Sequence, residues 1–167
     1  MHILASERLH YRLMNLQDAA LLHELDQDER VMKYINGAKK PSMQEIEDVM
    51  IPRLRQYLNP EKGWGIWQVS CQYNKEYIGW ILVRPMDFFS DRPQFDNLEV
   101  GWRFKSHTWG KGYATEAAKH IIDNIAAATN VKRFCAIAVQ ENISSIRIME
   151  KEGMRYVKTF VHKDPLV

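Results

Sequence analysis

The sequence feature that most constrains this chain is a pair of glycines placed directly before a long amphipathic pattern. The stretch SHTWGKGYATEAAKHI, residues 106–121, has Gly110 and Gly112 one residue apart and Ala114 two residues further on. A helix start leaves backbone N–H groups unpaired and carries the positive end of the helix dipole, so it attracts anions where no bulky side chain blocks the approach. Lys111 adds a positive charge. The stretch therefore predicts an anion-binding helix start; the alternative is a glycine-rich turn without a ligand.

Two well-known glycine motifs do not match this stretch. A dinucleotide-binding loop requires GxGxxG, but the sixth position here is Thr115, and no acidic residue ends a strand about 20 residues later. A P-loop requires GxxxxGK followed by Ser or Thr, which residues 110–115 do not supply. These mismatches argue against dinucleotide and nucleoside triphosphate sites, and they leave a nicotinamide-dependent oxidoreductase as a distant alternative.

Length and composition indicate one compact domain over residues 1–167, because 46% of the residues are hydrophobic and 26% are charged. Cys71 and Cys135 lie far apart in apolar runs, and we expect buried, reduced thiols in a cytoplasmic protein. The six histidines form no spaced cluster, so no metal site is expected. No apolar run approaches the roughly 18 residues of a membrane span. We expect neither a membrane nor a nucleic acid as partner.

Charge is distributed unevenly along the chain. Residues 1–102 carry 12 lysines and arginines against 15 aspartates and glutamates, whereas residues 103–167 carry 11 against 6. One interpretation is a C-terminal part built to meet an anionic ligand; the other is chance scatter.

Periodicity and capping residues predict a single mixed α/β domain. Ser42 and Glu45 form a capping box that starts a helix ending near residue 58, and Pro52 should split that helix into two pieces. Along residues 98–105, Glu99 and Arg103 share one face of an alternating strand. The other expected elements are a strand at 9–14, a helix after Asp18, hairpin strands at 64–71 and 76–83, a loop at 85–97, a helix ending near 129, a strand at 131–139, a helix at 142–152 and a strand at 154–161.

Three separated motifs resemble one family. WGKGYATEA, which follows LEVGWRF closely, is similar to the pyrophosphate loop of the GNAT superfamily, the acyl-coenzyme A-dependent N-acyltransferases. Its pattern is Gln or Arg, two residues, Gly, one residue, then Gly or Ala; the first position departs here to Trp109. ASERLHYRLMNLQDA and QENISSIRIMEKEGM are similar to the branch that contains the ribosomal-protein alanine and serine N-acetyltransferases. The resemblance spans nearly the whole chain.

The resemblance implies a central, mixed, mostly antiparallel sheet of six or seven strands flanked by about four helices. Its fourth and fifth strands splay apart around the pantetheine arm of acetyl-coenzyme A, the cosubstrate, and the pyrophosphate lies on the amides of residues 110–115. The implied cofactor-binding residues are Val100, Gly101, Trp109, Gly110, Lys111, Gly112, Tyr113, Ala114, Thr115 and Asn142. Asn142 is also the expected N-cap of its helix.

The resemblance also implies catalytic roles. Glu99 lies on the strand that borders the acetyl group in the family, where a glutamate acts as base directly or through water; the alternative is a solvated carboxylate paired with Arg103. An amide near Val100 would bind the thioester carbonyl. Ser145 resembles the serine that contacts the sulfur, or it is a first-turn serine bonded to backbone. Met149 replaces the tyrosine that many members use as acid.

The acceptor is the least constrained part. We expect a primary amine, either a protein N-terminus or a small molecule, attacking acetyl-coenzyme A directly in a ternary complex; the alternative is a non-catalytic acyl-coenzyme A-binding module. Acidic and aromatic loop residues either form an acceptor rim or are solvated charges and core aromatics. They are Asp26, Asp28, Glu29, Asp87, Asp91, Asp96, Phe88, Phe89 and Phe95. After residue 161 the seventh strand is either absent or a stub, and the resulting open edge predicts a homodimer.

Overall fold

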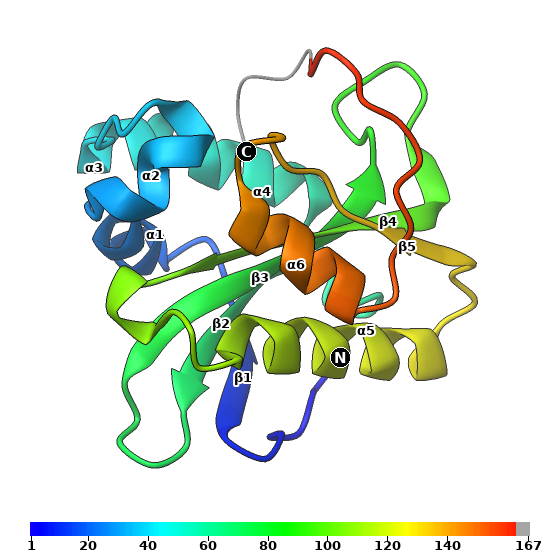
Figure 1. Ribbon diagram of the computed structural model, residues 1–167, viewed down its shortest axis with the longest axis horizontal. Helices are drawn as coiled ribbons and strands as arrows, with labels where there is room; N and C mark the ends of the chain where they lie inside the picture. Colours follow the sequence, from blue (N-terminus) through cyan, green and yellow to red (C-terminus); the bar gives the residue numbers. More distant parts are fainter. Residues whose placement is uncertain (163–167) are drawn as a thin grey trace.

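The computed structural model describes residues 1–162, which form one five-stranded sheet in the order β1-β2-β3-β4-β5 (Figure 1). The first four strands are antiparallel neighbours, and β5 runs parallel to β4. The strands are β1 (Leu9–Leu13), β2 (Gly65–Cys71), β3 (Tyr77–Met86), β4 (Gln94–Phe104) and β5 (Arg133–Cys135).

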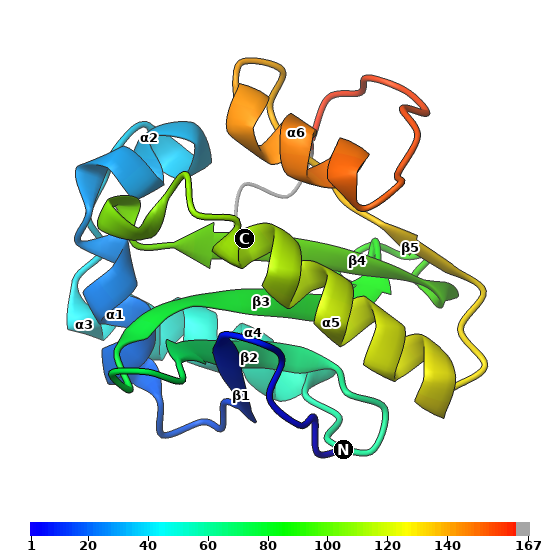
Figure 2. The same cartoon turned by 60° about the horizontal axis from the view of Figure 1, so that its bottom comes forward.

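Helices cover both faces of the sheet (Figure 2). The helices are α1 (Ala19–Asp26), α2 (Glu29–Asn36), α3 (Met43–Glu45), α4 (Ile51–Tyr57), α5 (Tyr113–Ala128) and α6 (Ile143–Lys151), with a π-helical turn η1 (Ile46–Met50) and a 3-10 turn η2 (Ser106–Thr108). One core packs α5 against Val83 and Val100, and the other packs α1, η1 and α4 against Leu82. Alternation along β3 and β4 therefore assigns successive residues to different cores.

Pro52 acts differently from the expected split. The chain from Met43 to Tyr57 passes without a gap from α3 through η1 into α4, and Pro52 lies in the first turn of α4. Proline has no N–H to donate to the preceding turn, and a π-helical turn directly before it accommodates that loss. The predicted capping box begins this helix as expected, because the Ser42 side chain accepts a hydrogen bond from the Glu45 amide (3.1 Å).

Two strand predictions are wrong. The expected strand at 131–139 is reduced to Arg133–Cys135, and the expected strand at 154–161 does not form, so the described residues contain five strands rather than six or seven. Tyr156 and Val157 are more than 80% exposed. Residues 154–161 cannot form a strand without a neighbouring strand to pair with, and β5, the edge strand of the sheet, is only three residues long. The expected seventh-strand stub begins at His162, and residues 163–167 lie outside the described part of the chain.

The short β4–β5 ladder opens the edge of β4. Asn97, Leu98 and Glu99 face β5, whereas β4 from Val100 onward has no β5 partner. Residues 136–139 leave the sheet instead of continuing alongside it. This is the splay that was expected between the fourth and fifth strands.

Within residues 1–162, no helix combines the length and the apolar character needed to cross a membrane. The same residues contain no group of three or more His, Cys, Asp or Glu side chains arranged to hold a metal ion.

Replacing Asp26 tests how α1 is fixed to β4. Arg103 Nη1 donates to Asp26 Oδ1 (2.7 Å), and both side chains are at most 4% exposed. Asp26→Asn leaves the Arg103 charge buried without its counterion, so we expect the free energy of unfolding to fall by about 3–5 kcal/mol in urea titrations. Asp123→Asn, which breaks the exposed Lys119–Asp123 pair on α5, is the control and should leave stability unchanged. A loss below about 1 kcal/mol in Asp26→Asn would contradict this assignment.

Candidate functional site

The start of α5 is a loop held open by two left-handed glycines. Gly110 has φ 76° and Gly112, the N-cap of α5, has φ 77°. Non-glycine residues rarely adopt such angles, so these positions require glycine. A Cβ added to Gly110 would meet no atom within 4 Å, and one added to Gly112 would meet only Arg8 Nη2 at 3.5 Å. The space beside the loop is therefore open, and the amides at the start of α5 can face a ligand there.

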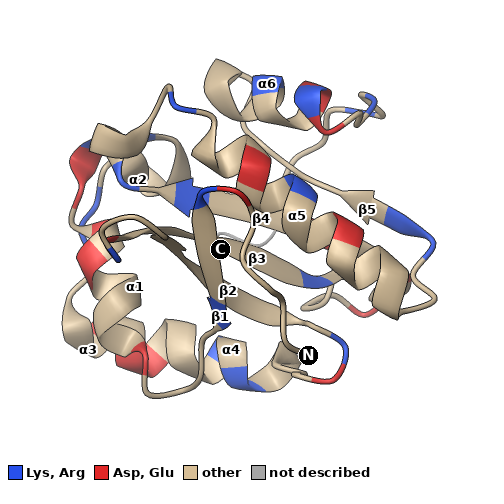
Figure 3. Cartoon of the chain, turned by 90° about the horizontal axis from the view of Figure 1, so that it is seen from below, with Lys and Arg blue, Asp and Glu red and all other residues tan. Residues whose placement is uncertain are grey.

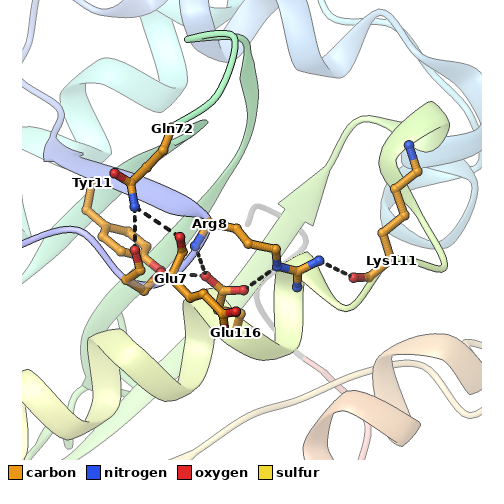
Figure 4. A network of polar contacts seen from close by, with 7 residues as sticks. Glu7, Arg8, Tyr11, Gln72, Lys111 and Glu116 are labelled. Carbon is orange, nitrogen blue, oxygen red and sulfur yellow. Dashed lines mark hydrogen bonds and ion pairs between the residues drawn. The ribbon is translucent and has the colours of Figure 1, made fainter.

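Residues before β1 hold this loop in place through a network of polar contacts (Figure 4). Arg8 Nε donates to Glu116 Oε1 (2.6 Å), and Arg8 Nη1 donates to the Lys111 carbonyl (2.8 Å). Glu116 Oε2 accepts hydrogen bonds from Ser6 Oγ (2.6 Å) and from the Arg8 amide (3.0 Å). Arg8 also lies over the Tyr113 ring, with 4.5 Å from Cζ to the ring centroid. The contacts of Arg8 thus connect the chain before β1 to Lys111, between the two glycines, and to Glu116 in the first turn of α5.

A cavity of about 760 Å³ runs from this loop along the open edge of β4. Its walls come from α2, β3, β4, the glycine loop, residues 137–142 and α6. Of the twelve predicted site residues, all except Lys111 line it. They are Glu99, Val100, Gly101, Trp109, Gly110, Gly112, Tyr113, Ala114, Thr115, Asn142 and Ser145.

Glu99 is neither solvated nor paired with Arg103. It is 6% exposed, and Arg84 Nε on the neighbouring strand donates to Glu99 Oε2 (3.0 Å). Arg84 in turn lies beside the rings of Tyr57 and Phe89, at 5.4 and 5.5 Å from Cζ to the centroids. The alternative of a solvated carboxylate paired with Arg103 is therefore wrong: the partner of Glu99 is Arg84, the residue directly opposite in the β3–β4 register, and the role of Glu99 as a base stays a prediction.

Ser145 and Asn142 lie at the start of α6. Asn142 Oδ1 accepts a hydrogen bond from the Ser145 amide (3.2 Å), so Asn142 is the N-cap that its position indicated. Trp102 Nε1 of β4 donates to Ser145 Oγ (3.3 Å). Because Ser145 Oγ accepts from the indole, its own hydroxyl hydrogen remains available to a second acceptor in the cavity.

The Cys135 thiol next to Glu99 is not a candidate acid, base or nucleophile, because it is partly buried. Cys135 is the β5 residue opposite Glu99, and its pKa is raised to about 12 by burial and then by the negative charge of Glu99. A thiol with this pKa stays protonated near neutral pH and is a poor nucleophile. Neither Cys135 nor Cys71 lines the cavity, so the candidate reactive groups there are carboxylates and hydroxyls, among them Glu99 and Ser145.

Of the two interpretations of the acidic loop residues, the cavity lining does not support an acceptor rim. None of its six acidic residues lines the cavity. Asp26 is buried against Arg103, and Asp28 caps α2 and accepts from Ser106. The charges that do line the α2 side of the cavity are Arg30, Arg84, Arg103 and Glu99.

Opposite charges are interspersed on the outer surface, so the uneven distribution along the chain does not produce a uniformly basic face there. In Figure 3, blue and red segments alternate along α5, in agreement with the ion pair between Lys119 and Asp123 (2.9 Å). Lys111, the cation of the glycine loop, lies outside the cavity lining.

Sequence reasoning missed α2, which supplies Arg30, Val31, Tyr34 and Ile35 to the cavity wall. The sequence does contain the capping residues of this helix: Asp28 caps its start, and Gly37 ends it in the left-handed conformation (φ 75°). The Arg84–Glu99 pair carried no local signal, since it depends on the register between two strands.

Acid titration tests the Arg8–Glu116 ion pair that holds the glycine loop. Burial acts to raise the pKa of Glu116, but the hydrogen bonds from Ser6 and Arg8 outweigh it and hold that pKa below its ordinary value of 4.5. The stability from this carboxylate is therefore present above pH 4.5 and is lost as the pH falls through the lowered pKa. We expect Glu116→Gln to cost about 1 kcal/mol at pH 7, a modest value because Arg8 is half exposed, and less at pH 3. A cost that does not change between these pH values would contradict the assignment.

Comparisons with known proteins agree with this architecture. The family described as acetyltransferase (GNAT) domain matches residues 8–155. The chain is 31% identical over 157 residues to the uncharacterized N-acetyltransferase YnaD of Bacillus subtilis (strain 168), covering 93% of this chain and 83% of that protein. It superposes on the crystal structure of a GNAT-family acetyltransferase from Bacillus anthracis with a TM-score of 0.72 and 28% identity, covering 93% and 84% of the two chains.

Aminoglycoside acetyltransferase AAC(6')-Ib in complex with coenzyme A has a TM-score of 0.69 and 16% identity, covering 87% of this chain and 83% of that one, and this likeness shows the fold alone. The family match extends over most of the chain, and it coincides with the sheet, the glycine loop and α6. This protein therefore belongs to the GNAT acetyltransferase family.

Proposed function

We propose that this protein transfers the acetyl group of acetyl-coenzyme A to a primary amine, by direct attack in a ternary complex. The observation that carries the proposal is the cavity itself, which joins a bare helix start to the open edge of β4 and to a buried carboxylate. An acyl carrier with a diphosphate needs the bare helix start and the open strand edge together, and a glycine turn without a ligand needs neither.

The donor fits the residues present. Its diphosphate would bind the amides of residues 110–115, where the space beside Gly110 is empty of protein atoms. The pantetheine arm would pair with the free β4 backbone from Val100 onward, as an added strand does. The amide of Val100 or Gly101 is then the candidate donor of a hydrogen bond to the thioester carbonyl. Asn142, at the N-cap of α6, borders the same space.

Glu99 is the proposed base. Amines are mostly protonated near neutral pH and attack only when neutral, so a carboxylate that accepts the proton directly or through a water assists the reaction. Arg84 donates a hydrogen bond to the Glu99 carboxylate and fixes its orientation, and the rings beside Arg84 restrict the guanidinium.

Ser145 is proposed to assist the leaving group. Its hydroxyl hydrogen is free because Trp102 occupies Oγ as a donor, so the hydroxyl can donate to the developing thiolate. A thiol with a pKa near 8.5 also leaves without a strong acid, which is consistent with Met149 in place of an acidic side chain.

The acceptor is proposed to enter between α2 and the β3–β4 face. The cavity walls there are aromatic and aliphatic. Two arginines in these walls, Arg84 and Arg103, are already paired with carboxylates. Among residues 1–162, these walls contain no acidic cluster of the kind that would attract a polycation. A small amine or a protein N-terminus fits them, and acetylation of a ribosomal-protein N-terminus remains a prediction from the sequence.

Glu99→Gln tests the base. Removing the carboxylate while keeping its shape should lower kcat about 10²–10⁴-fold, with the Kd for acetyl-coenzyme A unchanged. Thiol release measured with a panel of primary amines gives kcat, and calorimetry gives Kd. Glu141→Gln, an exposed carboxylate on the same cavity, is the control. Wild-type protein that binds acetyl-coenzyme A without turnover on any amine would favour the non-catalytic binding module instead.

A matched glycine pair tests the loop. Gly110 and Gly37 have nearly equal φ angles (76° and 75°), and an added Cβ meets nothing within 4 Å at either position. Gly110→Ala and Gly37→Ala should therefore lose similar stability, about 1–2 kcal/mol each. Because only Gly110 lines the cavity, only Gly110→Ala should weaken acetyl-coenzyme A binding, by about tenfold. Equal affinities in the two variants would place the diphosphate elsewhere.

A further inference from the structure

Three contacts join the corner between α1 and α2 to the chain that leads from β4 into the glycine loop. At the first, Asp26 pairs with Arg103 (2.7 Å). Two residues further along the first segment, Asp28 accepts a hydrogen bond from the Ser106 amide (3.1 Å) and another from its hydroxyl. Two residues further again, the Arg30 guanidinium lies over the Trp109 ring, with 5.2 Å from Cζ to the centroid. The two segments therefore run side by side up to the residue before Gly110.

The third contact differs from the other two because it leaves a charge unused. Arg103 is paired with the Asp26 carboxylate, and Asp28 accepts hydrogen bonds from Ser106. Arg30 is exposed on the cavity wall, and within residues 1–162 its side chain has no carboxylate partner. Its neighbour Glu29 pairs instead with Lys40 (3.0 Å). A guanidinium stacked on an indole keeps its N–H groups free in the plane of the stack, directed at whatever lies beside the ring.

The other cations that flank the glycine loop do not provide a free charge on the cavity side; Arg147 and Lys151 also line the cavity, but they come from α6. Arg8 is paired with Glu116 and bonded to the Lys111 carbonyl. Lys111 lies outside the cavity lining, and Arg84 is paired with Glu99. Arg30 therefore supplies an uncompensated positive charge next to the two left-handed glycines.

We infer that Arg30 binds a phosphate oxygen of the donor's diphosphate from the side opposite the α5 amides, so that α2 belongs to both the donor site and the acceptor wall. This inference rests on the proposed function. A guanidinium forms short, charge-assisted hydrogen bonds with phosphate oxygens, and the Trp109 ring holds it at the mouth of the loop. Since Val31, Tyr34 and Ile35 of the same helix line the cavity, donor binding through Arg30 also fixes the wall against which the acceptor lies.

The test compares two ligands that differ in their phosphates. Calorimetry measures the Kd of coenzyme A and of pantetheine, which lacks every phosphate, for wild type and Arg30→Gln. We expect Arg30→Gln to weaken coenzyme A binding at least about tenfold and to leave pantetheine binding unchanged. Arg30→Lys, which keeps the charge but loses the planar fork, should recover part of the affinity.

Lys33→Gln is the matched control. Lys33 lies on the same helix and also contacts an aromatic ring, with 5.1 Å from Nζ to the Tyr34 centroid, but it does not line the cavity. The Lys33→Gln variant should bind coenzyme A and pantetheine with the same Kd values as wild type. Circular dichroism melting of each variant checks that α2 is intact.

Each other outcome has a definite meaning. Unchanged coenzyme A affinity in Arg30→Gln overturns the inference while leaving the proposed function intact. An equal loss for coenzyme A and pantetheine also overturns it, because Arg30 would then act only by packing on Trp109. Wild-type protein that does not bind coenzyme A overturns both the inference and the proposed function.

Discussion

The site depends on a helix start, that of α5, whose backbone amides are not covered by side chains and whose position is nevertheless fixed. Gly110 and Gly112 adopt left-handed angles that leave the amides uncovered, and such a loop has little side-chain packing of its own. The stabilising contacts come from outside it, through the Arg8–Glu116 ion pair below and the contacts of η2 with the α1–α2 corner above. These contacts hold the loop in place while the space beside Gly110 stays empty of protein atoms.

The second constraint is the alternation along β3 and β4. Val83 and Val100 face α5, whereas Arg84 and Glu99 face the opposite layer, so the same two strands contribute to one apolar core and place a buried ion pair on the other face. The ladder to β5 then ends at Glu99. The proposed base thus lies at the residue where β4 backbone becomes free, which brings a carboxylate and unpaired amides to the same place.

Local signals predicted the parts of the site that depend on neighbouring residues in sequence. The glycine loop, the α5 helix and the Asn142 cap follow from spacing and capping rules, and the structure confirms each as an element. The Asp26–Arg103 contact joins residues 77 apart and could not be read from spacing. The failure at residues 154–161 has a different cause, since a strand pattern forms a strand only where another strand accepts it. The register that pairs Arg84 with Glu99 likewise requires the folded sheet.

Binding of an acyl carrier's diphosphate by the amides at the start of α5 can be tested with backbone amide resonances, recorded by NMR during a coenzyme A titration. We expect the largest shift changes at residues 110–115 and a second group at Val100 and Gly101. Inorganic sulfate should shift only the first group. Saturating coenzyme A that leaves residues 110–115 unshifted would contradict diphosphate binding at these amides.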